Sequence, residues 1–186
     1  MSELYDKVEE YVKQCFTVRG KLSSRGMHLV RTKDCLLDIY PEADEAMLIA
    51  AVSHDIDSAF EEFKAGGTFN DPVYLKWHQE GAAQIIGKFL TEQDADTGEI
   101  EKVKRLVLTH EVGGDDEQNI IKDADSLSFF RGDLKDFISR HSANGSSTEH
   151  LLGKLDWMYT RVTADRVKVK AKPMYEEALK ILEQTK

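Results

Sequence analysis

His54 and Asp55 are neighbours in the sequence and stand just after a strongly apolar run, residues 47–52. An imidazole and a carboxylate in such a place are costly to bury unless a hydrogen-bond partner or a ligand satisfies them. A divalent cation would satisfy both side chains at once. The pair therefore predicts a metal site at the end of a buried element.

Four more side chains of the same kind occur along the chain: His28 upstream of the pair, and His78, His110 and Asp125 downstream. A donor set rich in imidazole nitrogen suits Mn, Fe, Co, Ni or Zn better than Mg or Ca, which prefer all-oxygen shells. Six candidate donors exceed the needs of one tetrahedral structural zinc. They suffice for two ions if one carboxylate bridges, so we expect one or two divalent transition metal ions per chain.

Helices must bring these side chains together. Apolar residues recur at helical spacing, flanked by capping or breaking residues, in eight segments. The segments are residues 4–16, 24–39, 44–55, 73–90, 98–110, 117–139, 148–160 and 164–184. Every candidate ligand lies in one of them, and a helical bundle can aim such side chains into a shared interior. The sequence therefore predicts an all-α fold, a single-domain helical bundle of about seven or eight helices.

Local signals refine this expectation. Ser23 or Ser24 fits the N-cap of the second segment, and Asp44 fits that of the third, which we expect to be central and buried. Turn-forming residues predict loops at residues 60–72 and 141–147, a bend near Gly132, and a kink or break at Pro173. No segment alternates in the manner of a strand for more than a few residues.

Composition and length limit the class of protein. The 186 residues suit one domain with a substantial core, and 41% hydrophobic with 32% charged residues is ordinary for a soluble globular protein. The longest apolar run is far too short for a membrane span, and the first residues do not resemble a signal peptide. Cys15 and Cys35 lack metal-motif spacing and fit reduced thiols, so we expect a cytoplasmic protein without membrane contact.

The charge balance bears on partners. A formal net charge of −9 argues against bulk nucleic-acid binding, which depends on Lys and Arg neutralising phosphates. It leaves room for a small anionic substrate, because a metal ion with a few basic residues can hold a phosphate inside an acidic protein. The sequence leaves homo-oligomerisation open.

The ordered pattern His, His-Asp, His, His, Asp resembles the HD superfamily of metal-dependent phosphohydrolases. The residues that carry it are His28 in Gly-Met-His-Leu-Val-Arg, His54-Asp55 in Ala-Val-Ser-His-Asp, His78 in Trp-His-Gln-Glu-Gly, His110 in Val-Leu-Thr-His, and Asp125 in Lys-Asp-Ala-Asp-Ser-Leu. The last segment resembles the family's Asp-Ala-Asp-x-Leu element, which selects Asp125 over Asp123. The resemblance spans about residues 20–130. It implies a single HD-type domain over residues 1–186, with closing helices at about 148–184.

The resemblance also implies roles for individual side chains. It assigns a first metal to His28, His54, Asp55 and Asp125, and a second metal to His78 and His110, with Asp55 as the bridge. His54 and Asp55 are thereby catalytic. Asp57, two residues past Asp55, is a candidate proton donor. The alternatives for Asp57 are a hydrogen bond to a ligand histidine and a helix-end carboxylate without a role.

The implied reaction is hydrolysis of a small phosphate mono- or diester, such as a nucleotide. Two metals about 3.5–4 Å apart lower the pKa of a shared water, and the metal-activated hydroxide would attack phosphorus in line. Basic side chains near the ligands would grip the phosphate. The candidates are Arg31, Lys104, Arg105 and Lys122, with Arg161 and Arg166 in the closing helices.

Two other functions stay open at this point. The same scaffold resembles that of di-iron oxygenases, for which six nitrogen and oxygen ligands would suit two irons. A non-catalytic ligand-binding or regulatory module is the third option, although such a module has no chemical need for the full ligand set. After Asp55 the chain does not match the Arg and Glu elements of the nucleotidase branch, and it has no Gly-Tyr-Pro extension of the cyclic-dinucleotide phosphodiesterase branch. The substrate therefore does not follow from the resemblance.

Overall fold

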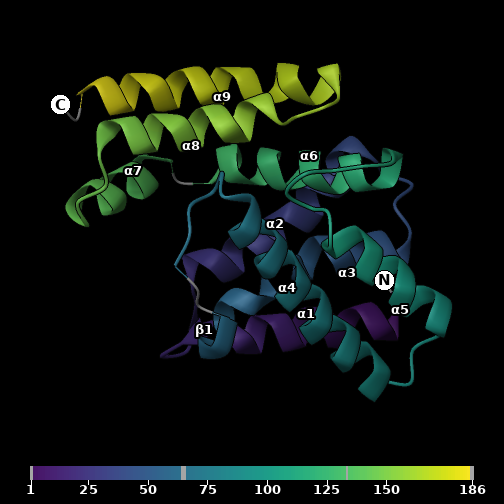
Figure 1. Cartoon of the computed structure of the whole chain (residues 1–186). Coiled ribbons are helices and arrows are strands. Elements are labelled where there is room, and N and C mark those ends of the chain that lie inside the picture. The colour runs from purple at the N-terminus through teal and green to yellow at the C-terminus, as the bar shows by residue number, and fades with distance from the viewer. Residues whose placement is uncertain (1, 64–65, 133, 185–186) are drawn as a thin grey trace.

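Almost all regular structure is helical in the computed structural model, which describes residues 2–63, 66–132 and 134–184. Within these residues the α-helices are α1 (Glu3–Cys15), α2 (Ser24–Ile39), α3 (Glu45–Ser53), α4 (Pro72–Glu92), α5 (Thr97–Val107), α6 (Asp116–Arg131), α7 (Leu134–Ala143), α8 (Thr148–Thr160) and α9 (Asp165–Gln184). Two 3₁₀ helices, η1 (Ile56–Ala59) and η2 (Glu61–Phe63), follow α3. The predicted all-α, single-domain bundle is confirmed (Figure 1).

Polar side chains fix where the helices begin. Ser23 caps α2 by accepting a 3.2 Å hydrogen bond from the Gly26 backbone N–H, and Asp44 caps α3 in the same way through Met47, at 3.1 Å. Each cap satisfies a backbone donor that has no partner within the helix. The two predicted N-caps are therefore confirmed, with Ser23 rather than Ser24 at the start of α2.

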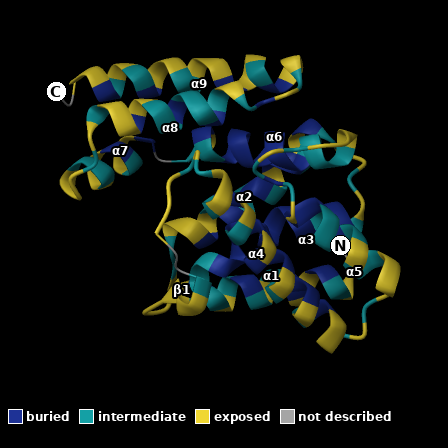
Figure 2. Cartoon of the chain, in the orientation of Figure 1, coloured by how far each residue is buried: buried dark blue, intermediate teal, exposed yellow. Residues whose placement is uncertain are grey.

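Helix α3 is the central element. It packs against α1, α2, α5 and α6, and its residues from Ala46 to Ser53 are buried apart from Leu48. A short helix that is apolar on every side needs neighbours on every side, as the dark blue colour of α3 shows in Figure 2. The side chains that follow its last turn consequently emerge inside the molecule.

The C-terminal helices form an outer layer. Helix α9 packs along α8 and also contacts α6, and the two helices run side by side along one edge of the molecule in Figure 1. One continuous hydrophobic cluster extends from Tyr5 in α1 to Leu182 in α9. The closing helices therefore belong to the same core as the helices that carry the predicted ligands.

Three local expectations need correction. The bend near Gly132 is a break: α6 ends at Arg131, Gly132 is extended (φ −70°, ψ 177°), and α7 starts at Leu134, which gives nine α-helices among the described residues instead of eight. Helix α7 continues to Ala143, into the predicted loop at 141–147. The predicted loop at 60–72 contains η2 and gives way to α4 at Pro72, and its residues 64–65 lie outside the described part.

Pro173 does not break α9, which continues on both sides of it. Proline removes one backbone donor and leaves the carbonyl four residues earlier without its helical partner. That carbonyl belongs to Val169, whose side chain is 72% exposed, and Pro173 itself is exposed. Because water can reach this side of the helix, the interruption is inexpensive.

A tight hairpin between α1 and α2 was not expected from the sequence. Its strands β1 (Thr17–Val18) and β2 (Lys21–Leu22) pair antiparallel. Arg19 and Gly20 between them both have positive φ angles, 52° and 75°, as a two-residue type I′ turn requires. Strands of two residues are too short to show an alternating pattern.

Candidate metal centre

The six predicted ligands meet in one buried cluster. They come from α2 (His28), the turn after α3 (His54 and Asp55), α4 (His78), the turn after α5 (His110) and α6 (Asp125). Apart from His28, each is at most 6% exposed. The cluster is therefore a polar site enclosed by helices that are otherwise packed through apolar side chains.

Each histidine is held through its Nδ1 atom. His54 Nδ1 lies 3.0 Å from the Ala51 carbonyl oxygen and His110 Nδ1 lies 2.8 Å from the Val107 carbonyl oxygen. A carbonyl can only accept, so Nδ1 carries a proton in both rings, and in the neutral form of either ring Nε2 presents the lone pair. This is the tautomer that binds a metal through Nε2.

The other two histidines are held by side chains. His28 Nδ1 donates to the Ser128 hydroxyl at 3.0 Å, and that hydroxyl donates in turn to the His28 carbonyl oxygen. His78 Nδ1 lies 2.5 Å from Asp57 Oδ2. Asp57 therefore occupies the position of a hydrogen-bond partner to a predicted ligand, which was one of the three alternatives for it.

The four Nε2 atoms converge on two carboxylate oxygens. His78 Nε2 lies 2.9 Å and His110 Nε2 lies 3.4 Å from Asp55 Oδ1. Asp125 Oδ1 lies 2.9 Å from His28 Nε2 and 3.5 Å from His54 Nε2. Two groups of three side chains have ligand atoms within 4.8 Å of one another, and Asp55 belongs to both: His28, His54 and Asp55, and Asp55, His78 and His110.

The second oxygen of each carboxylate is taken by an arginine. Arg25 of α2 pairs with Asp55 Oδ2, and Arg161, directly after α8, pairs with Asp125 Oδ2. Arg161 also pairs with Glu111 and donates to the Ser126 hydroxyl at 2.8 Å. Each carboxylate is thereby oriented so that its Oδ1 atom faces the histidines.

Electrostatics keep the two carboxylates ionised. Burial opposes ionisation of Asp55, but the charges of Arg25 and His54 outweigh it and hold the pKa of Asp55 well below its ordinary value. Burial likewise opposes ionisation of Asp125, and Arg161 with His54 lowers the pKa of Asp125 well below the ordinary value. The centre thus offers two anionic oxygens in the interior.

The histidines differ in their protonation. Burial lowers the pKa of His78, but its hydrogen bonds to Asp55 and Asp57 raise that pKa to about 10. Burial lowers the pKa of His28. The raised pKa favours a proton on both nitrogens of His78, and a metal ion bound through Nε2 would have to displace one of them.

Two buried atoms test whether a metal ion fits. His54 Nε2 and His110 Nε2 have no hydrogen-bond partner among the described residues. Donors about 2.05 Å from a tetrahedral ion lie about 3.3 Å apart. The 3.4 Å between His110 Nε2 and Asp55 Oδ1 and the 3.5 Å between His54 Nε2 and Asp125 Oδ1 are close to that spacing. The cluster can hold a metal ion, and its nitrogen-rich donors suit a transition metal.

One family comparison gives a match. The matching family, described as a domain of unknown function, DUF4202, covers residues 13–182. The chain belongs to the DUF4202 family. The DUF4202 region begins in α1, ends in α9 and includes all six predicted ligands. No curated protein and no solved structure matches the chain. None of the helices in the described ranges is both long and apolar enough to cross a membrane.

Two of the basic residues predicted to bind substrate lie near the centre. Arg31 Nε donates to the Ser128 carbonyl oxygen at 2.9 Å, next to the residue that holds His28. Lys122 is 6% exposed and its ammonium donates to Asn119 and to the Thr163 hydroxyl, at 3.1 and 2.7 Å. Both side chains are occupied with fastening α6 to its neighbours.

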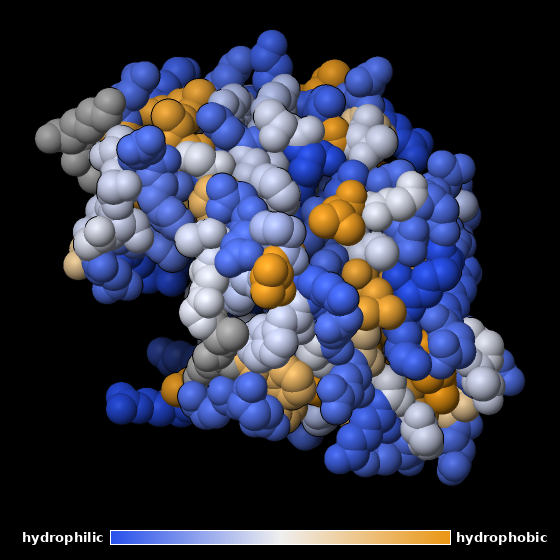
Figure 3. All heavy atoms as spheres, viewed as in Figure 1, coloured by the Kyte–Doolittle hydropathy of each residue, from blue (hydrophilic) through white to orange (hydrophobic). Residues whose placement is uncertain are grey.

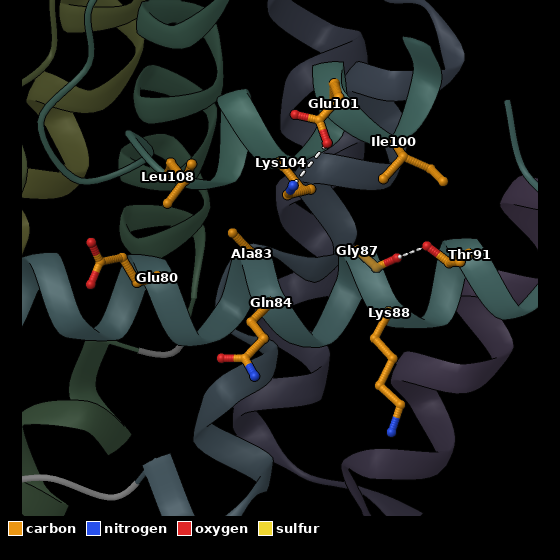
Figure 4. Close-up of a pocket in the computed structure, with 10 residues that line it drawn as sticks. All are labelled: Glu80, Ala83, Gln84, Gly87, Lys88, Thr91, Ile100, Glu101, Lys104 and Leu108. Atoms are coloured by element: carbon orange, nitrogen blue, oxygen red, sulfur yellow. Dashed lines mark hydrogen bonds and ion pairs between the residues drawn. The ribbon is translucent and has the colours of Figure 1, made fainter. Parts of the chain in front are cut away.

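The other two lie elsewhere. Lys104 pairs with Glu101 at 2.8 Å in a groove between α4 and α5, where Figure 4 shows the two side chains facing each other. Arg105 pairs with Asp115 and Glu117. No contact between described residues joins either side chain to the predicted ligands, so their substrate role stays a prediction without a contact to support it.

Sequence analysis did not single out Arg25, Glu111 and Ser128. Their distance in sequence from the predicted ligands could have indicated them. Arg25 precedes His28 by one helical turn, and Ser128 follows Asp125 by one turn. Glu111 is the residue after His110. Arg161 was a candidate for binding phosphate, and its pairing with Asp125 could not be read from a separation of 36 residues.

Proposed function

We propose that this chain is an HD-type metal-dependent phosphohydrolase that acts on a small phosphate mono- or diester. The observation that carries the proposal is the shared orientation of four imidazoles, each fixed through Nδ1 and directed through Nε2 at two carboxylate oxygens. A structural zinc needs four donors in a closed shell. Two groups of donors that share Asp55 suit a pair of ions, as phosphoryl-transfer sites often use.

The proposed ligands are the two groups of donors that share Asp55, together with Asp125, whose Oδ1 atom lies close to His28 and His54. His28, His54, Asp55 and Asp125 would hold one ion. Asp55, His78 and His110 would hold the other. Bound ions would supply a water of lowered pKa and would neutralise negative charge on the phosphate oxygens.

The remaining residues of the centre position these donors. Asp57 keeps His78 in one orientation and increases its basicity, as a carboxylate behind a ligand histidine does. Arg161 holds Asp125 in place from the buried side, with both side chains at most 7% exposed. Arg25 holds Asp55 from the open side, because its own side chain is 53% exposed. Arg25 is therefore placed to contact a phosphate that enters the site.

Metal content tests the proposal first. Protein purified without chelators should contain about two transition-metal ions per chain by elemental mass spectrometry, and about one in the His78→Ala/His110→Ala double variant. The second donor group loses two of its three side chains in that variant, whereas the first stays complete. The same low metal content in the wild type and the double variant would contradict a site for two ions.

Turnover tests it second. His54→Ala should lower metal-dependent hydrolysis of para-nitrophenyl phosphate, its bis ester or a nucleotide panel by at least ~1000-fold, about 4 kcal/mol in the barrier. Asp116→Asn is the matched control, since Asp116 is exposed in the first turn of α6. Full activity in His54→Ala, or oxygen consumption without phosphate release, would contradict the proposal.

A further inference from the structure

Lys154 faces the metal centre from α8. It precedes Arg161 by seven residues, or about two helical turns, so the two lie on the same side of α8 and the turn that follows it. Arg161 already pairs with Asp125 and Glu111 of the centre. The side of α8 that carries Lys154 is therefore the side that closes over the cluster.

The ammonium of Lys154 is held by an aromatic ring instead of a carboxylate. Its Nζ atom lies 5.4 Å from the centroid of the Phe69 ring, within the range of a cation–π contact. Phe69 is itself held against α8, with its centroid 5.4 Å from that of His150 and 6.2 Å from that of Trp157. Nothing in the described part of the chain forms an ion pair or a hydrogen bond with Lys154 Nζ.

The charges around Lys154 support this placement. Burial lowers its pKa; Glu111, Asp125 and Asp55 oppose that change, and Arg161 adds to it. The charged groups that act on Lys154 are thus those of the metal centre. Partial burial disfavours the charged ammonium of Lys154. An anion bound next to the ammonium would compensate for that cost, so this position favours anion binding.

The other cations of the centre already have partners. Arg25 is paired with Asp55, Arg161 with Asp125 and Glu111, and Lys122 donates to Asn119 and Thr163. Of these four cations, Lys154 is the one whose side chain has neither an ion pair nor a hydrogen bond among the described residues.

We propose that Lys154 binds a non-bridging oxygen of the substrate phosphate and thereby favours phosphate monoesters over phosphodiesters. This inference rests on the proposed function and narrows its substrate class. A monoester has one more anionic oxygen than a diester, and its second ionisation, with a pKa of about 6, is complete near neutral pH. An unpaired ammonium beside two metal positions gives that additional oxygen a partner.

The surface of the molecule is hollowed on one side. Figure 3 shows a hollow between α7 and the hairpin of β1 and β2. Arg25 lies three residues past β2, and His141 lies on α7. Burial and the charges of neighbouring basic groups, Arg25 and Lys154 among them, lower the pKa of His141. The lowered pKa favours the neutral form of His141, so of these two residues Arg25 is the one that carries a positive charge.

Phosphate binding tests the proposal without any turnover. Inorganic phosphate is titrated into metal-loaded full-length protein by calorimetry, with Lys154→Met, Lys154→Arg and the control Lys172→Met. Lys172 is 63% exposed on α9 and pairs with Glu176. Lys154→Met should weaken phosphate binding by at least ~10-fold, Lys154→Arg by no more than about 3-fold, and Lys172→Met should leave it unchanged, with equal metal content in all four proteins. Unchanged affinity in Lys154→Met, or no phosphate binding by the wild type, overturns the proposal.

Turnover separates this proposal from the proposed function. In Lys154→Met, kcat/KM for para-nitrophenyl phosphate should fall at least ~10-fold, and kcat/KM for the bis ester should fall less than about 3-fold. Equal losses for both esters would overturn the monoester preference and leave the phosphohydrolase proposal standing. A wild type that binds metal and phosphate but hydrolyses neither ester would contradict the proposed function and keep Lys154 as a phosphate-binding residue.

Discussion

The candidate metal centre and the outer face of α5 use the same kinds of charged pair in different surroundings. In the centre, Arg161 and Asp125 are 6% and 7% exposed. On the outer face, which we call the α5 surface network, Lys102 pairs with Asp44 and Glu117, and Arg105 pairs with Asp115 and Glu117. Arg105 and Asp115 are 39% and 54% exposed. Water can replace a partner in the network, whereas a group in the centre has only the protein to compensate its charge.

The largest expected effect comes from breaking one pair in each region. In chelator-treated protein, Arg161→Met should lower the free energy of unfolding by about 3–5 kcal/mol, because it leaves Asp125 buried without its guanidinium. Arg105→Met should lower it by about 1 kcal/mol or less. Urea denaturation measures both. Excess metal should reduce the loss of stability in Arg161→Met, since a bound cation replaces part of the missing charge. Equal losses in the two variants would contradict the expected difference between the buried pair and the exposed pair.

An intermediate effect is expected at Asp57. Asp57→Asn keeps an acceptor for His78 Nδ1 but removes the negative charge, so metal affinity should fall by about 10–100-fold. Metal titration with a competing chelator measures the change. Asp116→Asn removes a carboxylate from the exposed start of α6 and should leave the affinity unaltered. If the two variants bind metal alike, Asp57 has no part in the centre.

The smallest effect should appear at the cap of α6. Asp115 and Gln118 form a capping box, in which each side chain accepts a hydrogen bond from the backbone N–H of the other residue. Asp115→Ala should lower the free energy of unfolding by about 1 kcal/mol and leave metal content unchanged. Thermal unfolding and elemental analysis of the same sample check the two parts, and a loss of metal would connect the surface network to the centre.

The sequence predicted most of the helices for clear physical reasons. Apolar residues at helical spacing and side-chain caps such as Asp44 are local features, and they determine where α2 and α3 begin. The convergence of the predicted ligands followed from one ligand, or one adjacent pair, in each of several helices. The central position of α3 followed from its uniformly apolar sequence.

Other features depend on contacts that local patterns do not report. The hairpin at residues 17–22 has strands too short for periodicity, and the break after Arg131 is a change to extended backbone at one residue, Gly132. The cations that reach the centre come from α2 and from the far end of α8, while Lys104 and Arg105, close to His110 in sequence, point to the surface. Proximity in sequence was therefore a poor guide to the cations that reach the centre.

The hydrogen bonds from His54 to the Ala51 carbonyl and from His110 to the Val107 carbonyl have a consequence for how this centre can change. Both acceptors belong to the last turn of a helix, where carbonyl groups lack intrahelical donors, so each histidine closes its helix with one nitrogen and faces the centre with the other. Moving either histidine by one position in the sequence would remove both the hydrogen bond at the helix end and the Nε2 atom that faces the centre. An insertion or deletion near these turns should therefore be tolerated only outside the span that joins the carbonyl to the imidazole. The spacing of three residues between carbonyl and imidazole thus fixes where each histidine stands relative to the end of its helix.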